Sequence, residues 1–68
     1  MRQTLIYQDE DGIWIVEVPS LPGCGSDGQT YDEAIERVKE AIEVWIEDAE
    51  AHGEPIPEDL APITVVAV

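Results

Sequence analysis

The glycines at residues 23–28 have a spacing that could bind phosphate. The stretch reads GCGSDG and follows the Gly-x-Gly-x-x-Gly pattern of dinucleotide-binding loops. Such loops hold a pyrophosphate at the positive N-terminus of a helix, where backbone N–H groups bind it. Here Asp27, Asp32 and Glu33 surround the expected helix start and would repel a phosphate, and the chain is too short for a Rossmann fold. We therefore interpret the glycines as residues that let the chain turn between a strand and a helix.

Three other groups could carry chemistry, but each lacks the neighbours that chemistry needs. Cys24 is the only cysteine, and because a reactive thiolate needs a positive neighbourhood, we expect it to face the core. His52 has no Ser or Cys arranged beside it, and its expected role is to stabilise the negative end of a helix. The turn at Asp9–Asp11 lacks the ligand spacing of a calcium loop. We predict no catalytic residue, metal or cofactor, and the catalytic alternative is a minimal hydrolase that uses this turn.

The charge balance restricts the kinds of partner. The chain carries 16 acidic residues against 3 Lys and Arg, a formal net charge of −13. This disfavours nucleic acid and anionic membrane surfaces, and it suits a basic protein partner or simply keeps the protein in solution. The N-terminus shows no signal peptide, no apolar run is long enough to cross a membrane, and a free cysteine suits the reducing cytoplasm.

The size of the chain indicates one domain, residues 1–68. A fold of 68 residues buries only roughly 60% of its unfolded surface and is marginally stable alone. One cysteine excludes a disulfide within the chain, and one Cys with one His makes structural zinc implausible. We therefore expect a homo-dimer or tetramer.

The elements that would position these groups follow from the apolar pattern. Residues 2–8 and 13–18 are predicted strands joined by a polar turn that ends in Gly12. Prolines then interrupt regular pairing, and a short third strand is expected within residues 23–28.

The helix after this loop is the clearest element. Thr30 and Glu33 match a capping box, Gly53 supplies a stop, and Pro55 and Pro57 prevent continuation. An uncharged arc of about 140° predicts one face packed on a sheet. The arc contains Tyr31, Ala34, Ile35, Val38, Ala41, Ile42, Trp45, Ile46 and Ala49.

The opposite helix face is acidic. It carries Glu36, Glu40, Glu43, Glu47 and Glu50. Like charges four residues apart, as in Glu36/Glu40 and Glu43/Glu47, oppose helix formation by a few tenths of a kcal/mol. This face is either solvated surface or a docking surface for a basic partner, and Glu36, Glu40, Glu43 and Glu47 are our candidate partner-binding residues.

The C-terminal residues are expected to complete the sheet. Residues 54–62 form a Pro-rich connection, and ITVVAV at 63–68 is predicted to be a strand that is apolar on both faces. It would lie in its own sheet or at a subunit interface. The predicted fold is α+β, a two-layer β-β-β-α-β arrangement with the helix on a mainly antiparallel sheet. With the last strand beside the first, this becomes a partial ribonuclease-H-like unit.

These segments together resemble the HicB antitoxin family, in particular its short single-domain members. The matching residues are D-E-D-G-x-W-x-V-x-V-P-x-L-P-G-C at 9–24, G-x-T-x-x-E-A at 28–34, E-A-I-x-x-W-I at 40–46 and G-E-P-I-P at 53–57. Within this signature we expect structural roles for Pro22, Gly23, Cys24, Gly28, Thr30 and Glu33.

The resemblance implies both a fold and a function. The implied fold is three strands, a helix and a further strand, like a partial ribonuclease-H unit without its catalytic acids. The implied function is to neutralise a small basic ribonuclease toxin of the HicA type by masking its RNA-binding surface. Many HicB proteins also carry a C-terminal DNA-binding domain, and we expect none here. The alternative function is an orphan homo-oligomeric module that binds another protein or a small molecule.

Overall fold

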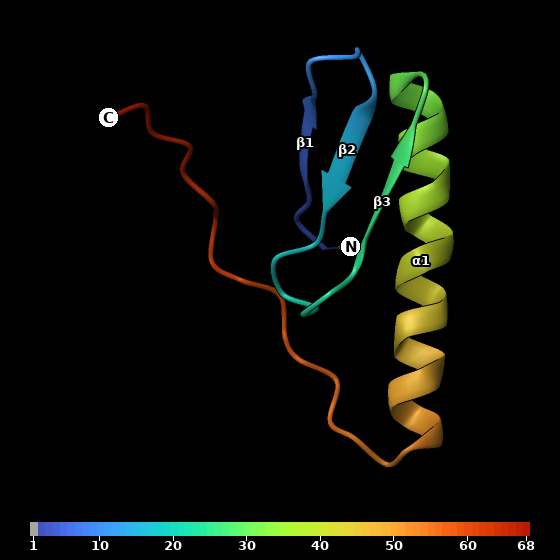
Figure 1. The fold of residues 1–68 in the computed structure, drawn as a ribbon. Helices are drawn as coiled ribbons and strands as arrows, with labels where there is room; N and C mark the ends of the chain where they lie inside the picture. Colours follow the sequence, from blue (N-terminus) through green and yellow to red (C-terminus); the bar gives the residue numbers. More distant parts are fainter. Residues whose placement is uncertain (1) are drawn as a thin grey trace.

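A computed structural model describes residues 2–68 and shows three strands followed by one long helix (Figure 1). The elements are β1 (Leu5–Gln8), β2 (Trp14–Glu17), β3 (Gly25–Gly28) and α1 (Tyr31–Ala51). The three strands form one antiparallel sheet in the order β1-β2-β3, and α1 packs on one face of it over β3 and β2. The predicted α+β fold with two layers is therefore confirmed.

The first two strands form the predicted hairpin. Residues Asp9–Gly12 connect them, and the Asp9 carboxylate accepts hydrogen bonds from the backbone N–H groups of Asp11 at 2.9 Å and Ile13 at 3.0 Å. Gly12 has φ of +82°, a left-handed conformation that glycine adopts without strain. The Asp9 side chain is thus used to hold the turn.

Alternation along the strands brings one set of side chains under the helix. Val16 of β2 and Ala34 and Val38 of α1 are almost completely buried, and Val18 and Leu21 from the loop after β2 complete this core together with Cys24. Ile6 and Trp14 pack against its edge. Because side chains alternate across a sheet, the intervening residues Tyr7 and Glu17 lie on the opposite face, where they are exposed.

Both ends of α1 are capped as the sequence indicates, with one correction. The Thr30 hydroxyl accepts a hydrogen bond from the Glu33 backbone N–H at 3.1 Å. The Glu33 carboxylate was expected to reach back to Thr30, but it accepts from the Gln29 backbone N–H at 3.3 Å. The same carboxylate oxygen, Oε1, also forms an ion pair with Arg37 one turn later, at 3.3 Å from Nη2.

The helix ends where the glycine was expected to stop it. Gly53 has φ of +67°, its N–H donates to the Glu50 carbonyl, and the N–H of Glu54 donates to the Ala49 carbonyl. These two bonds form a Schellman motif, which satisfies carbonyls that the last helical turn leaves free. Within residues 2–68, no helix is both long and apolar enough to cross a bilayer.

The prediction of a strand at residues 63–68 is wrong for this structure. The segment is extended and exposed, with Val65 83% and Val66 67% accessible, and it belongs to no sheet (Figure 1). The physical reason is that a strand needs a neighbour to pair its backbone groups, and this segment turns away from β1. The ribonuclease-H-like topology, which depends on that strand, stays a prediction.

Candidate functional site

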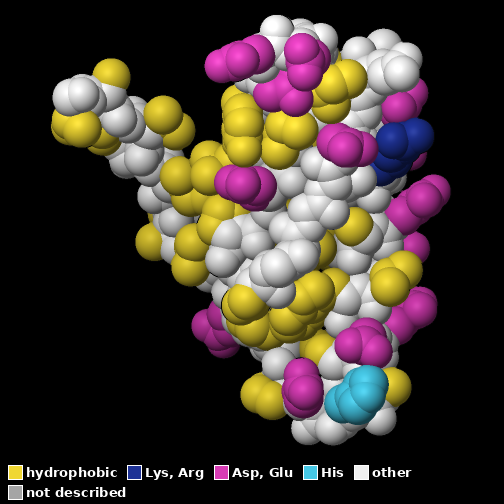
Figure 2. Space-filling view, viewed as in Figure 1, with side chains coloured by type: hydrophobic (Ala, Val, Ile, Leu, Met, Phe, Trp, Pro, Cys, Tyr) yellow, Lys and Arg dark blue, Asp and Glu magenta, His cyan; other side chains and the backbone are white. Residues whose placement is uncertain are grey.

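The four candidate glutamates form an acidic stripe along the outer side of α1. Glu36, Glu40, Glu43 and Glu47 are all exposed, and they fall within an arc of about 60° over a length of about 16 Å. Figure 2 shows acidic side chains following the outer edge of the helix. The stripe lies opposite the buried residues Ala34 and Val38, so the fold holds it away from the core.

Most of the stripe has no cation beside it. Glu36 pairs with Lys39 at 3.2 Å. Among residues 2–68, no Lys, Arg or His lies within ion-pair distance of Glu40, Glu43 or Glu47. Exposed like charges on neighbouring turns repel one another, and a partner that supplies positive charge relieves this repulsion. The arrangement therefore suits contact with a basic surface.

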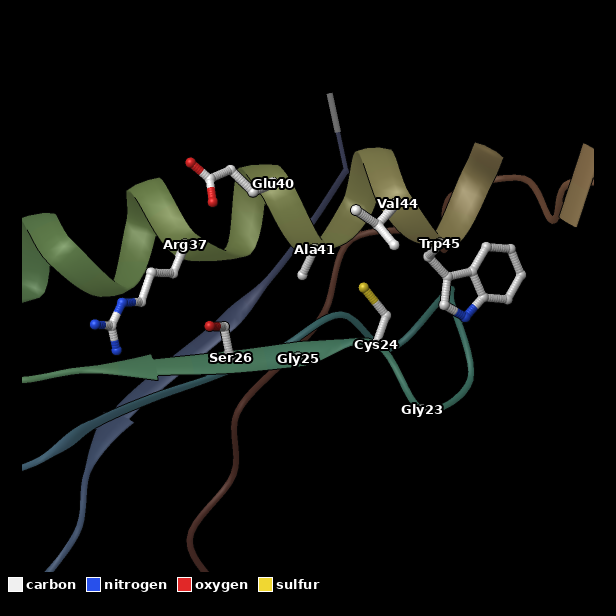
Figure 3. A pocket seen from close by; sticks show the side chains of 9 residues that line it. All are labelled: Gly23, Cys24, Gly25, Ser26, Arg37, Glu40, Ala41, Val44 and Trp45. Carbon is white, nitrogen blue, oxygen red and sulfur yellow. The ribbon is translucent and has the colours of Figure 1, made fainter. Parts of the chain in front are cut away.

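A groove runs beside the stripe, between α1 and the free edge of β3, with a volume of about 490 Å³ (Figure 3). The sulfur of Cys24 points from the strand side toward Ala41 on the helix. Val44 and Trp45 line one end of the groove, and Arg37 lines the other. This β3–α1 groove thus has an apolar floor, and its one cation, Arg37, is paired with Asp27 and Glu33 rather than with the acidic stripe.

Two residues of the groove were not identified from the sequence as binding residues. Val44 falls outside the apolar helix arc and is 63% exposed, so it is an apolar side chain among acids. Its place outside the apolar helix arc was the one feature of the sequence that could have identified it as an exposed binding residue. Trp45 was assigned to the core, but it is only half-buried, and its indole N–H donates to the Pro22 carbonyl at 3.0 Å.

The edge of β3 along this groove has backbone groups that pair with no strand. Because the Cys24 carbonyl accepts from Val18, the alternation of an antiparallel ladder points Cys24 and Ser26 toward β2 and turns Gly25 and Asp27 outward. Arg37 occupies part of this edge, since its Nη1 lies 3.4 Å from the Asp27 carbonyl oxygen. The remaining groups at Gly25 are free to pair with an added strand, a common mode of peptide binding.

The signature glycines hold this edge in place. Gly23 has φ of +78°, and Gly28 lies so close to α1 that a Cβ on it would be 2.5 Å from the Ala34 backbone nitrogen. A side chain at Gly28 would push β3 away from the helix. The Gly-x-Gly-x-x-Gly spacing therefore serves close packing of backbone on backbone, and the helix start beside it is occupied by the Thr30 and Glu33 caps.

The remaining candidates lie away from the groove or are buried in its floor. Burial raises the pKa of the Cys24 thiol, with a smaller opposite effect from Arg2. The pKa of His52 is raised by its hydrogen bond to the Asp48 carbonyl at 2.8 Å, and further by the Asp48 carboxylate. In the part of the chain that the structure describes, no three His, Cys, Asp or Glu side chains are grouped to hold a metal.

Comparison with known proteins agrees with this arrangement of strands, loop and helix. Residues 3–67 match the family described as the HicB-like antitoxin of bacterial toxin–antitoxin systems. A UPF0150 protein of Thermoplasma acidophilum is 50% identical over 69 residues, covering 98% of this chain and all of the relative. A UPF0150 protein of Synechocystis is 50% identical over 46 residues, covering 68% of this chain and 67% of the relative.

A solved structure shows the same fold. The crystal structure of the N-terminal domain of the antitoxin HicB of Burkholderia pseudomallei superimposes with a TM-score of 0.75 at 30% identity, covering 87% of this chain and 69% of that chain. Sequence and fold therefore lead to one assignment. The chain belongs to the HicB-like antitoxin family of toxin–antitoxin systems.

Proposed function

We propose that this protein neutralises a small basic ribonuclease toxin of the HicA type by covering its RNA-binding surface, without chemistry of its own. The observation that carries the proposal is the acidic stripe beside the β3–α1 groove. Three of its four glutamates have no cation partner within residues 2–68, and an apolar groove with a free strand edge runs alongside. A toxin whose RNA-binding surface is basic has the complementary charge.

The two parts of this surface have different roles in the proposal. The acidic stripe speeds the encounter, because complementary charges steer association. The groove supplies affinity, because Val44 and Trp45 offer apolar area and Gly25 offers backbone groups to an added segment. Bound in this way, the toxin's basic surface is no longer open to RNA.

The test is co-expression with the small basic protein encoded by the adjacent reading frame, followed by co-purification and stopped-flow binding. In the variant Glu40→Lys/Glu47→Lys we expect the association rate to fall by about tenfold at low salt, and the difference to shrink at high salt. The matched control is Glu10→Lys/Asp11→Lys, which changes the net charge equally in the exposed hairpin turn. The control should lower the rate much less.

Two results would overturn the proposal. Equal losses in both variants would mean that only net charge matters, and the stripe would be solvated surface. Failure of every such neighbour to co-purify would leave the family fold with a different partner. A third measurement addresses catalysis: metal-dependent RNA cleavage by the isolated chain, lost in Asp11→Asn, would replace masking with hydrolysis.

A further inference from the structure

The backbone of β3 at Gly25 borders two open depressions, one on each face of the sheet. The first is the β3–α1 groove, and the second, which we call the outer pocket, has a volume of about 540 Å³. Leu5, Glu17 and Gly25 line the outer pocket and are cross-strand partners, so they stand in one row across the three strands. This row alternates with that of the buried Val16 and therefore lies on the face away from the helix. The two depressions thus meet at the backbone of Gly25.

Gly25 keeps this row open at the edge of the sheet. A Cβ on Gly25 would lie 2.7 Å from the Val16 carbonyl oxygen, so a side chain does not fit there without a shift of the backbone. The Gly25 N–H and carbonyl point away from β2, as the antiparallel ladder requires. A strand added at this edge would pair with Gly25, and the residue opposite Gly25 would place its side chain on the outer face. Its two neighbours would point into the β3–α1 groove.

The distance to Glu17 favours a long side chain at this position of the added strand. A residue opposite Gly25 lies two strand spacings from Glu17, which is about 10 Å between Cα atoms. No side chain stands between them, because Gly25 has none. Lys and Arg can lay their aliphatic stems across such a gap and bring the charged group to the Glu17 carboxylate. Pro19 and Pro22 supply apolar walls for the stem.

Glu17 has no cation of its own chain beside it. Its carboxylate accepts a hydrogen bond from the Tyr7 hydroxyl at 3.4 Å, and its charge is the main cause that raises the pKa of Tyr7. Within residues 2–68, no Lys, Arg or His is within ion-pair distance of Glu17, and no other charged residue lines the outer pocket. Arg2 donates to Ser20 and lines a separate hollow beside α1. A cation supplied by a partner would therefore meet no competitor at Glu17.

We infer that the basic partner presents an extended segment that pairs with Gly25 and directs a Lys or Arg side chain across it to Glu17. Charge favours this occupant. An acidic side chain would be repelled by Glu17 and by Asp27, the other residue of β3 on the outer face, although Asp27 is paired with Arg37 at 3.5 Å. The inference rests on the proposed function for the identity of the partner. It adds the place and the type of one side chain that this partner must present.

The residues that flank this cation in the added segment point into the β3–α1 groove. At one end they meet Val44 and Trp45, which lie over Cys24 (Figure 3). At the other end the groove is lined by Arg37 and Glu40. We therefore expect an apolar residue next to the cation on the Cys24 side and a polar residue on the other side.

The first test compares Glu17→Gln with Glu10→Gln in calorimetric titrations with the small basic protein of the adjacent reading frame. Both changes remove one negative charge from an exposed side chain and keep its shape. Glu17→Gln should weaken binding by about tenfold, because the partner's cation loses its counter-charge, whereas Glu10→Gln should weaken it by less than about twofold. Equal affinities of Glu17→Gln and the unchanged protein would overturn the inference and leave the masking of the toxin standing.

The second test detects the added strand by amide hydrogen exchange in the free protein and in the complex. The Gly25 N–H points outward, so it should exchange fast in the free protein and at least about tenfold more slowly in the complex. The Ser26 N–H, which faces β2, is the control and should be protected in both states. A complex in which exchange at Gly25 is not slowed would contradict the added strand.

The third test does not need the toxin. The probe is a synthetic heptapeptide in which Lys and Val alternate, and the control peptide carries Gln in place of Lys. In NMR titrations the Lys peptide should shift the Gly25 amide and bind the Glu17→Gln protein about fivefold more weakly than the Glu10→Gln protein. Equal binding of the Lys peptide to the two variants would overturn the inference. A selective Lys peptide, together with a neighbouring protein that does not bind, would support the site at Glu17 and overturn only the proposed function.

Discussion

The two edges of this small sheet differ in how they meet the helix. At the β3 edge, Gly28 brings backbone against backbone, and a narrow groove remains along the helix. At the β1 edge α1 makes no such contact, and a hollow of about 500 Å³ remains between α1 and the residues before β1, with Arg2, Lys39 and Glu43 in its lining. The acidic stripe runs between them on the outer side of α1. One amphipathic helix, placed off-centre on three strands, thus leaves two hollows with different linings, one on each side of it.

The two edges also differ in the side chains they offer. The β3 groove is lined by Glu40, Arg37 and the exposed Val44, whereas the hollow is lined by Arg2, Lys39, Glu43 and apolar residues of α1. In the proposed function the basic partner binds on the β3 side. The predictions below test this difference.

The largest expected effect comes from adding a side chain at Gly28, where the backbone of β3 lies against the backbone of α1. Gly28→Ala puts a Cβ 2.5 Å from the Ala34 nitrogen and 2.9 Å from its Cα. Both are backbone atoms that cannot rotate away, so we expect a loss of about 2–3 kcal/mol in the free energy of unfolding. Urea denaturation followed by circular dichroism measures it. Gly23→Ala is the comparison: its Cβ meets open space, and only the left-handed φ of +78° costs about 1 kcal/mol. Equal losses would show that β3 is not held by this contact.

The difference between the two sides is tested by two apolar-to-polar changes. Val44→Ser on the groove side should weaken toxin binding by about tenfold and leave the fold intact, because 63% of Val44 is already exposed. Ile35→Ser on the hollow side should leave toxin binding unchanged. Calorimetric titration measures toxin binding in both variants. Equal losses of affinity would mean that the toxin does not bind on the groove side alone.

A smaller effect is expected in the rate at which a reagent modifies the Cys24 thiol. Burial raises its pKa, so the thiolate is scarce at neutral pH, and modification by a thiol reagent should be slower than in the urea-unfolded chain. Since its sulfur lies in the floor of the groove, bound toxin should slow modification further. Toxin binding without added protection would place the toxin elsewhere on the surface.

The smallest effect is expected at His52, at the end of α1 and outside both surfaces. Its pKa is raised above the ordinary 6.5 by the Asp48 carbonyl and then the Asp48 carboxylate. A raised folded-state pKa contributes stability that is fully present below 6.5 and is lost as pH rises through the folded value. An NMR titration should show the raised pKa, and Asp48→Asn should lower it part of the way. His52→Gln should remove this pH dependence and leave toxin binding unchanged.

Local signals predicted most of the chain correctly. The hairpin, the third strand and the helix lie where alternation, Gly12 and the Thr30 cap placed them, because each depends on neighbours within a few residues. The prediction failed at residues 63–68, where six β-favouring residues were assigned a strand. A strand exists only with a partner, and local composition does not say whether that partner is present.

The charge, the acidic stripe, the helix and its ends were predictable from the sequence, since periodicity and capping act along the chain. The position of α1 over β3, and not over β1, depends on contacts that form only in the folded protein. That offset comes from the close approach of Gly28 to Ala34 and from the Trp45–Pro22 hydrogen bond. Pro22 and Trp45 lie 23 positions apart in the sequence, so no local pattern encodes their contact. The same offset turned Val44 outward beside a groove and left an open hollow beside β1.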